Sequence, residues 1–354
     1  MPDERLLIRA EEQLASMRIR EALRLFRLAE RAGCDPDSCA AGRWTCYMLC
    51  GDFESAWRES DAISNRGKPD PHRFWDGRPV HGRTVLIRCL HGLGDSIQFL
   101  RYAPLIRGEA RRLIIEAQPT LKSLIQQSGL ADEVITWGEP EPHWDQQIEI
   151  IELPRIFRTS VDSIPNHVPY LHAPVGPYER SRPIRVGIVW ASSVYNPARS
   201  VPLQEMAELF TVPGASFFTL QGGIERAQLE PWSKQIIDLY DESACVLAAA
   251  KNLNGLDLVI SVDTMIAHLA GAMARPVWTL LPYECDWRWM LNRDDSPWYP
   301  TMRLFRQTSH RNWHTVIQRV RRALEQFVST GSTAFPDRLN GQHHQHLEHL
   351  VREA

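Results

Sequence analysis

Short apolar runs alternate with amphipathic stretches from about residue 83 to residue 327. The clearest unit lies between Leu258 and Leu281, where an apolar strand at Leu258–Val262 ends at Asp263-Thr264. A helix with apolar residues at helical spacing follows, and a second apolar strand begins at Val277. Strands that alternate with helices in this way predict an α/β fold with parallel, doubly wound sheets.

The same pattern divides the α/β part into two predicted domains. The proline-rich stretch 164–183 separates a first domain at 83–178 from a second at 183–327. Two Rossmann-like domains of this size are expected to face a cleft, and ligands bind beyond the carboxyl ends of the strands in such folds. The expected strands are 84–90, 113–116, 133–137, 147–151, 185–190, 217–220, 236–239, 258–262 and 277–281, with helices at 96–106, 121–127 and 312–327.

Residues 1–68 have a helical pattern without strands, and three helices are expected there. An apolar stripe runs from Leu14 to Ala29 in the first of them. The later step Gly51-Asp52-Phe53-Glu54 resembles the turn of a tetratricopeptide repeat, of which about one and a half units are present. Such hairpins bury one face against a neighbour, so this segment is expected to dock on the next domain or on a protein partner. A linker is predicted at 69–82 and a polar, mobile tail at 328–354.

Composition excludes several classes of protein. The 354 residues carry 40 Lys and Arg against 43 Asp and Glu, so no global basic field favours nucleic acid. No apolar run approaches the roughly 20 residues of a membrane span. The charged start of the chain lacks the apolar core of a secretory signal, and a cytoplasmic protein is expected.

Cysteine and histidine clusters are the only hints of a metal site, and both are weak. Seven cysteines, an odd number, indicate reduced thiols rather than a disulfide framework. Four of them could hold zinc, but their spacing lacks a close C-x2-C pair. The histidines near the end of the chain are expected to be solvated. The cysteines concerned are Cys34, Cys39, Cys46 and Cys50, and the histidines are His343, His344, His346 and His349.

Asp263 and Thr264 lie where a predicted strand delivers polar residues to the start of a helix. Free N–H groups and the positive end of the helix dipole converge at such a point and favour phosphate. His268 lies one turn further along the same helix face and can reach the same ligand. These residues indicate a nucleotide-type ligand. The alternative is an ordinary strand–helix turn in which Asp263 caps the helix and His268 is structural.

The segment Gly92-Leu93-Gly94-Asp95 also follows a predicted strand and opens a helix. Its glycines let the backbone come close to a ligand. The third glycine of the dinucleotide fingerprint is missing, and so is the Gly-Lys-Ser/Thr of a Walker loop. Asp95, at the mouth of the predicted cleft, is a candidate general base for a hydroxyl. The alternative is that Asp95 caps a helix beginning at Ser96.

Two more segments carry candidate binding residues. The loop 191–200 contains Ser192 and Arg199, and a guanidinium offers a fork of donors to phosphate oxygens. Asp286 and Trp287 belong to an aromatic and acidic stretch, and rings beside carboxylates suit a sugar or a nucleoside. The alternative for that stretch is a packed aromatic corner against the interdomain surface.

Taken in order, these motifs resemble the heptosyltransferase-type glycosyltransferases of GT-B fold, the family that includes ADP-heptose:lipopolysaccharide heptosyltransferases. They look closest to the branch that carries N-terminal tetratricopeptide repeats. The resemblance covers about residues 80–327. The matching segments are Gly92-Leu93-Gly94-Asp95 with Tyr102-Ala103-Pro104, Val186–Ala191, Ser261–Thr264 with Ala267–Ala272, Asp286-Trp287-Arg288-Trp289 and Ser296–Pro300.

The resemblance implies metal-independent transfer of a sugar, with inversion and without a cofactor, from a nucleotide-diphosphate-sugar. The second domain would hold this donor, and an acceptor would enter from the first. The family's catalytic aspartate falls on Asp95, which would deprotonate the acceptor hydroxyl. Arg199 stands where the family places a basic residue for the leaving diphosphate.

The same resemblance places the donor contacts around the strand–helix turn of the second domain. The diphosphate-contacting turn falls on Thr264 and Met265. Heptose-transferring members usually have glycine at the position of Met265, so the pocket is expected to be tighter here. The further donor contacts implied are Ser261, Asp263 and His268, with sugar or nucleoside contacts at Gly94, Ser192, Gln221, Asp286 and Trp287.

Three functions are therefore compared. The leading one is a glycosyltransferase whose acceptor is a glycan, a lipid-linked glycan or a protein. The second is a non-catalytic nucleotide-binding scaffold whose helical segment binds a protein partner. The third is a sugar-nucleotide epimerase, which shares the two-domain architecture. Fold alone does not separate them.

Overall fold

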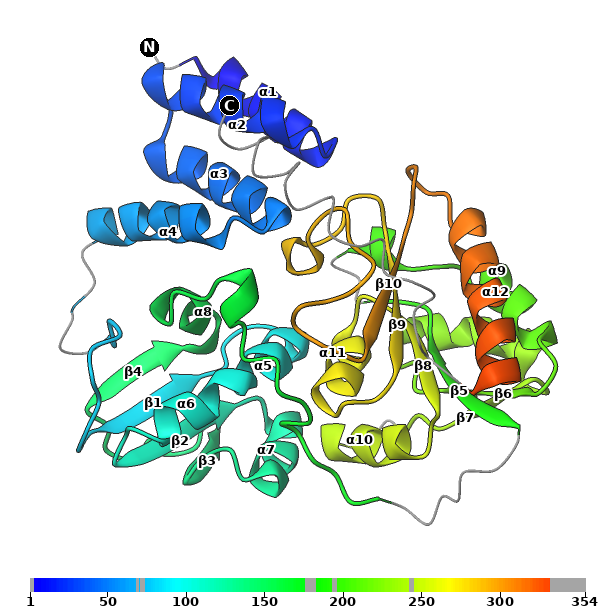
Figure 1. Ribbon diagram of the computed structural model, residues 1–354. Coiled ribbons are helices and arrows are strands. Elements are labelled where there is room, and N and C mark those ends of the chain that lie inside the picture. Colours follow the sequence, from blue (N-terminus) through cyan, green and yellow to red (C-terminus); the bar gives the residue numbers. More distant parts are fainter. Residues whose placement is uncertain are drawn as a thin grey trace.

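The computed structural model describes residues 3–67, 70, 74–175, 183–192, 196–241 and 245–331. A helical arm precedes two domains, each built on a parallel sheet with helices packed against it (Figure 1). The predicted fold class is therefore confirmed. The tail after residue 331, with the four histidines named above, lies outside the described residues.

The helical arm contains four helices where the sequence indicated three. The break falls at Met17, which has a φ of 55° without being glycine, so no turn residue announced it. The predicted turn after the third helix is present: Gly51 caps it with a φ of 79°, which glycine adopts without strain. The helices are α1 (Glu4–Ala15), α2 (Ile19–Arg31), α3 (Pro36–Cys50) and α4 (Phe53–Gly67).

The arm packs against both sheet domains. The indole N–H of Trp57 on α4 donates to the carbonyl of Thr159 in the first domain at 2.7 Å. The carbonyl of Leu49 on α3 accepts from the N–H of Leu291 in the second domain at 2.8 Å. Because both bonds are tertiary contacts of the body of the protein, the arm is part of the folded core.

The first domain has four parallel strands in the order β3-β2-β1-β4. Within the predicted linker, Phe74 forms a parallel bridge to Gln147 at the edge of this sheet. The single helix expected at 96–106 is divided into α5, a 3-10 turn and α6, which begins just before Pro104. The elements are β1 (Thr84–Arg88), β2 (Arg112–Ala117), β3 (Glu133–Thr136), β4 (Gln146–Glu149), α5 (Leu93–Phe99), α6 (Ala103–Arg107), α7 (Lys122–Ser128) and α8 (Leu153–Ile156).

The second domain has six parallel strands in the order β10-β9-β8-β5-β6-β7. Strands β8 and β9 have the predicted bounds, whereas β10 was not predicted from the sequence. Helices pack on both faces of this sheet, with α11 and α10 toward the first domain and α12 on the far face (Figure 1). The elements are β5 (Ile184–Val189), β6 (Ala215–Thr219), β7 (Ile236–Asp238), β8 (Leu258–Val262), β9 (Val277–Leu281), β10 (Met302–Arg306), α9 (Leu203–Met206), α10 (Val246–Asn254), α11 (Met265–Ala272) and α12 (His314–Thr330).

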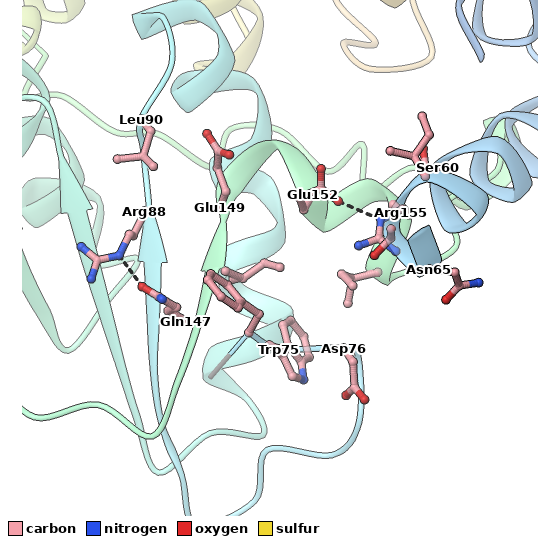
Figure 2. A pocket seen from close by; sticks show the side chains of 15 residues that line it. Ser60, Asn65, Trp75, Asp76, Arg88, Leu90, Gln147, Glu149, Glu152 and Arg155 are labelled. Carbon is pink, nitrogen blue, oxygen red and sulfur yellow. Dashed lines mark hydrogen bonds and ion pairs between the residues drawn. The ribbon is translucent and has the colours of Figure 1, made fainter. Parts of the chain in front are cut away.

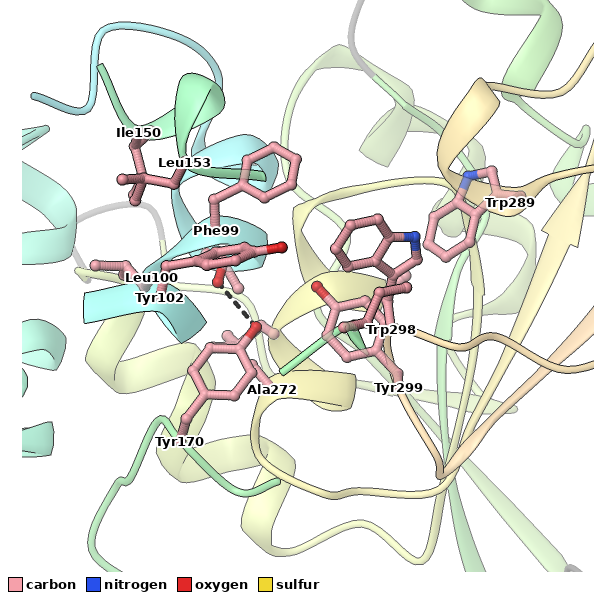
Figure 3. Close-up of a cluster of buried hydrophobic side chains, with 14 of the residues drawn as sticks. Phe99, Leu100, Tyr102, Ile150, Leu153, Tyr170, Ala272, Trp289, Trp298 and Tyr299 are labelled. Carbon is pink, nitrogen blue, oxygen red and sulfur yellow. Dashed lines mark hydrogen bonds between the residues drawn. The ribbon is translucent and has the colours of Figure 1, made fainter. Parts of the chain in front are cut away.

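One hydrophobic core continues from the arm through the first domain into the second. Figure 3 shows its aromatic part, where Phe99 and Tyr102 of the first domain approach Trp298 and Tyr299 of the second. Arg101, only 3% exposed, lies within 4.6 Å of the Tyr299 ring centre and donates to the Trp298 carbonyl at 2.5 Å. A buried cation held this way fixes the two domains against each other.

All seven cysteines are free thiols. Within the described part of the chain, no group of three or more His, Cys, Asp or Glu is arranged to hold a metal ion. Among the helices of that same part, none combines the length and apolarity needed to cross a membrane.

Candidate active site

Helices α5 and α11 meet between the two sheets, and each follows a strand in the middle of its own sheet. Gly94 on α5 lies directly against His268 on α11. A Cβ atom at Gly94 would lie 3.1 Å from Cδ2 of that histidine, a distance tighter than nearly all real Cβ contacts. The sequence predicted a cleft between the two domains, with Asp95 at its mouth. The structure instead brings α5 and α11 into contact, because glycine at position 94 permits close approach.

Asp95 is the third residue of α5 and faces the second domain. Its Oδ2 accepts from the backbone N–H of Gly92 at 3.1 Å, and its Oδ1 forms an ion pair with Arg288. The sequence allowed Asp95 to be the residue before a helix starting at Ser96. The helix begins at Leu93 instead, so Asp95 caps it from inside the first turn.

An alternating row of charges connects Asp95 to the second domain. Arg288 bonds to Asp286 at 2.8 Å, and Asp286 lies 3.4 Å from Arg199. Arg199 lies 3.2 Å from Asp263. His268 ends the series, with Nε2 3.8 Å from Asp263 Oδ1. We call these six residues, Asp95, Arg288, Asp286, Arg199, Asp263 and His268, the charge row.

Burial sets the protonation of the inner end of the charge row. Burial first, and then the Arg288 charge, lower the pKa of His268 to about 3, so the imidazole is neutral at pH 7. Burial also raises the pKa of Asp263 above its ordinary value, against the opposing effect of Arg199. Burial alone would raise the pKa of Asp286. The positive charges of Arg288 and Arg199 outweigh burial, so the pKa of Asp286 is lowered.

The neutral His268 ring is held by its neighbours. Its Nδ1 lies 2.9 Å from the hydroxyl of Tyr299, and its ring stacks on Trp289 with centroids 5.2 Å apart. Nε2 is the nitrogen that faces Asp263. A histidine held in this way orients a hydrogen bond without carrying charge.

The start of α11 has the geometry expected of an anion site. Thr264 is the N-cap in extended conformation, and Met265 is the first helical residue. The side-chain oxygen of Ser261, at the end of β8, lies 3.0 Å from that of Thr264 and donates to the Val262 carbonyl at 2.7 Å. The first N–H groups of a helix have no partner within it and carry partial positive charge.

Gln221 and Ser192 hold the end of β5 and the loop after it. The side-chain amide of Gln221 accepts from Trp190 and Ala191 N–H at 3.0 and 2.9 Å and donates to two backbone carbonyls. Ser192 donates its hydroxyl to the Asn196 carbonyl at 2.9 Å. Both side chains shape the loop that carries Arg199. Residues 193–195 of that loop lie outside the described part.

Trp287 lies in a packed aromatic corner, as one of the two interpretations from sequence held. Its ring meets Trp44 of the arm edge-on at 5.3 Å and stacks on Phe99 of the first domain at 6.5 Å. The Arg288 guanidinium lies 4.7 Å from its centre. The ring therefore supports Arg288, which the sequence analysis did not name as a site residue. The signal for it was its place in the matching segment Asp286-Trp287-Arg288-Trp289.

This arrangement combines three chemical functions. Asp95 supplies a carboxylate from the first domain, paired with Arg288 and with the Gly92 N–H. Two guanidinium groups, Arg199 and Arg288, and the start of α11 offer donors to an anion. The carboxylates of the charge row keep these cations oriented. Such a site suits a reaction in which a hydroxyl attacks and a phosphate-bearing group leaves.

Solved structures share this two-domain fold. The glycosyl transferase family 9 structure from Veillonella parvula DSM 2008 has a TM-score of 0.50 at 12% identity, covering 78% of this chain and 99% of that one. ADP-heptose lps heptosyltransferase II of E. coli has a TM-score of 0.53 at 13% identity, covering 70% and 99%. The heptosyltransferase-type GT-B fold expected from the motifs is therefore confirmed.

The sequence itself has a curated relative in Protein FlbA of Caulobacter vibrioides, which is 24% identical over 372 residues. The match covers 91% of this chain and 61% of FlbA, so the chain spans about three fifths of that protein's length. No protein-family model matches the chain. The fold is thus that of family 9 glycosyltransferase and heptosyltransferase structures.

Proposed function

We propose that the protein is a glycosyltransferase that moves a sugar from a nucleotide-diphosphate-sugar to an acceptor hydroxyl. The observation that supports this most is the charge row, which joins the Asp95 carboxylate of one domain to Arg199 and the start of α11 in the other. In this proposal the first domain is the acceptor side and the second the donor side, and the fold shared with the solved glycosyltransferase structures supports that assignment.

In the proposed reaction the acceptor O–H gives its proton to the Asp95 carboxylate. The oxygen attacks the anomeric carbon and forms the new C–O bond as the bond from that carbon to the phosphate oxygen breaks. The nucleoside diphosphate leaves with the electron pair, and attack from the opposite face inverts the anomeric configuration. General base catalysis of this kind contributes about 10²- to 10⁴-fold.

The leaving diphosphate gains negative charge as the bond breaks. Arg199, Arg288 and the N–H groups at Met265 are the proposed stabilising donors, each worth roughly 3–4 kcal/mol when preorganised in a water-excluded site. Arg199 and Arg288 now bond to carboxylates, so donor binding would exchange part of these bonds for phosphate oxygens. The carboxylates keep the two cations within reach in the absence of donor.

Metal independence is part of the proposal, since these cationic donors supply the charge that a divalent ion would otherwise provide. The chain is proposed to need no cofactor and to work in the cytoplasm. The decisive experiment incubates the purified full chain with a panel of nucleotide sugars and follows release of nucleoside diphosphate. Release that persists in EDTA and is lost in Asp95→Asn supports the proposal, whereas full turnover in Asp95→Asn contradicts the mechanism.

One observation favours a second candidate, a nucleotide-binding scaffold without transfer activity. The Asp95 carboxylate is already bonded to Arg288 and to the Gly92 N–H. A base that stays in these bonds would not accept a proton from an acceptor. Tight binding of a nucleoside diphosphate, with no consumption of any nucleotide sugar, would select this candidate.

A further inference from the structure

A cavity of about 740 Å³ lies between the helical arm and the first sheet domain (Figure 2). One wall comes from the second half of α4, with Ser60, Ser64 and Asn65. The opposite wall comes from the carboxyl ends of β1 and β4, with Leu90 and Glu149. This volume falls within the usual range of ligand pockets, about 300–1,000 Å³.

Asp95 does not line the cavity, but Glu149 and Glu152 of its lining belong to a segment that lies against the helix of Asp95. Glu149 ends β4, and the turn that follows it, Ile150–Glu152, packs against α5, the helix that carries Asp95. Burial raises the pKa of Glu149, and the nearby Asp95 charge raises it further. His91, three residues after β1 ends at Arg88, pairs with Glu149 at 2.6 Å. Ligands of parallel α/β sheets bind at this edge.

The rim of the cavity exposes large apolar side chains. Phe74 is 45% exposed and Leu90 is 52% exposed, and both line the cavity. Trp137, also 45% exposed, donates its indole N–H to the Cys89 carbonyl beside Leu90. Exposed apolar side chains that gather at one place mark an interaction surface or a ligand-binding groove.

Charged side chains that line the cavity already have ion-pair partners in the protein. Arg88 forms ion pairs with Glu116 and Glu141, and Arg155 forms one with Glu152. Contacts to a ligand therefore depend mainly on aliphatic and aromatic surface together with amide and hydroxyl groups. This chemistry suits the mixed side chains and backbone of a polypeptide better than a polyhydroxylated glycan or an anionic lipid carrier.

We propose that this cavity is the acceptor site and that its occupant is a polypeptide segment that presents a serine or threonine hydroxyl to Asp95. The inference rests on the proposed function and names its acceptor class. Helix α4 then has a direct role, since it forms the wall that faces the sheet edge (Figure 2). Apolar residues beside the acceptor hydroxyl would contact Leu90 and Phe74.

The test measures binding of short fluorescent peptides, each centred on serine or threonine with varied flanking residues, to the purified full chain. Ser64→Trp fills the cavity from α4, and Glu54→Trp places the same ring at an exposed position of that helix outside the cavity. Leu90→Ser removes apolar surface at the rim. Its control is Leu105→Ser, an exposed leucine of α6 outside the lining.

Wild type is expected to bind a subset of peptides with apolar residues beside the hydroxyl. Ser64→Trp and Leu90→Ser should each weaken that binding by about tenfold or more, which corresponds to about 1.4 kcal/mol. Both controls should bind as wild type does. Equal binding by Ser64→Trp and wild type, or no peptide binding by wild type, would overturn the acceptor site.

Neutral oligosaccharides are assayed on the same proteins. If they bind and the peptides do not, and Ser64→Trp abolishes their binding, the cavity is a glycan site and the polypeptide class is wrong. Thermal shift with nucleoside diphosphates tests the donor half separately. No shift in wild type would contradict the proposed function, whereas peptide binding lost in Ser64→Trp with an unchanged shift supports the site.

Discussion

Arg288 of the second domain bonds to Asp95 of the first, so the proposed base and the proposed donor site share one ion pair across the domain interface. The same guanidinium bonds to Asp286 at 2.8 Å and to the Gln98 side chain at 2.8 Å. One side chain therefore links α5 to the aromatic corner. Because Arg288 holds Asp95, Asp286 and Gln98 at once, the geometry of the charge row depends on this residue.

Replacing Arg288 by glutamine is expected to destabilise the protein by about 2–3 kcal/mol. Breaking a fully buried pair costs about 3–5 kcal/mol, and the partial exposure of Asp95 reduces this. The free energy of unfolding in urea measures the effect. Arg58→Gln, which breaks the exposed pair with Glu54, is the matched control and should leave stability close to that of wild type. Equal effects of the two variants would show that Arg288 has no special role.

Gly94→Ala is expected to separate α5 from α11. The added Cβ would lie 3.1 Å from Cδ2 of His268, which is buried and held by Tyr299 and Trp289 and cannot move away easily. Overpacking of this kind costs roughly 1–3 kcal/mol.

Thermal unfolding of Gly94→Ala, compared with that of Gly67→Ala, measures this cost. A Cβ at Gly67 would meet nothing within 4 Å, so that variant should be neutral or slightly stabilising. If Gly94→Ala were as stable as wild type, the two helices would not be in the contact described.

Features of this site that depend on neighbouring residues in the sequence could be predicted, whereas contacts between residues far apart in the sequence could not. Strands β8 and β9 and the Thr264 turn were predictable because local apolar runs and a polar break define them. The Arg288–Asp95 pair joins residues 193 positions apart, and no local pattern encodes such a contact. Strand β10 was missed because it has only five residues, two of them arginine, and Met302-Arg303-Leu304-Phe305-Arg306 has neither a continuous apolar run nor a strict alternation.

In the helical arm, too, a local turn could be predicted from the sequence but a tertiary contact could not. Its turn at Gly51 follows from the need for a positive φ. The cavity beside α4 depends on how that helix meets the edge of the first sheet, near the bridge between Phe74 and Gln147. Because this docking is tertiary, the sequence indicated an arm that docks on the next domain or on a partner, but not a cavity.

His268 is expected to make the protein less stable in acid. Its pKa is about 3 in the folded protein against about 6.5 when unfolded, so the unfolded chain binds the extra proton between these values. The contribution of the neutral, buried His268 to the free energy of unfolding is complete above about pH 6.5. Below that pH it falls by about 1.4 kcal/mol per pH unit. Asp263 acts in the opposite direction, because its raised pKa lets the folded state bind a proton first.

The comparison of His268→Gln with wild type isolates the histidine from Asp263. Unfolding free energy is measured at several values between pH 4 and pH 7, and slopes are compared rather than absolute stabilities. In His268→Gln, the free energy of unfolding should decrease much less between pH 7 and pH 4 than it does in wild type. His314→Gln, at an exposed position of α12, should keep the wild-type slope. An unchanged slope in His268→Gln would mean that the imidazole is not held neutral by burial.

Arg199→Ala is expected to weaken nucleoside diphosphate binding by about 10- to 100-fold, because a hydrogen bond to a charged group is worth about 1.5–3 kcal/mol. Binding of the corresponding nucleoside, which lacks phosphates, should change little. Titration calorimetry with both ligands measures the two affinities, and Arg321→Ala on α12, an exposed ion-pair residue, is the control. Since Arg199 also bonds to Asp263 and Asp286, its loss leaves two carboxylates closer to the phosphates and adds repulsion. Equal losses for nucleoside and nucleoside diphosphate would place Arg199 in the scaffold of the loop rather than at the phosphates.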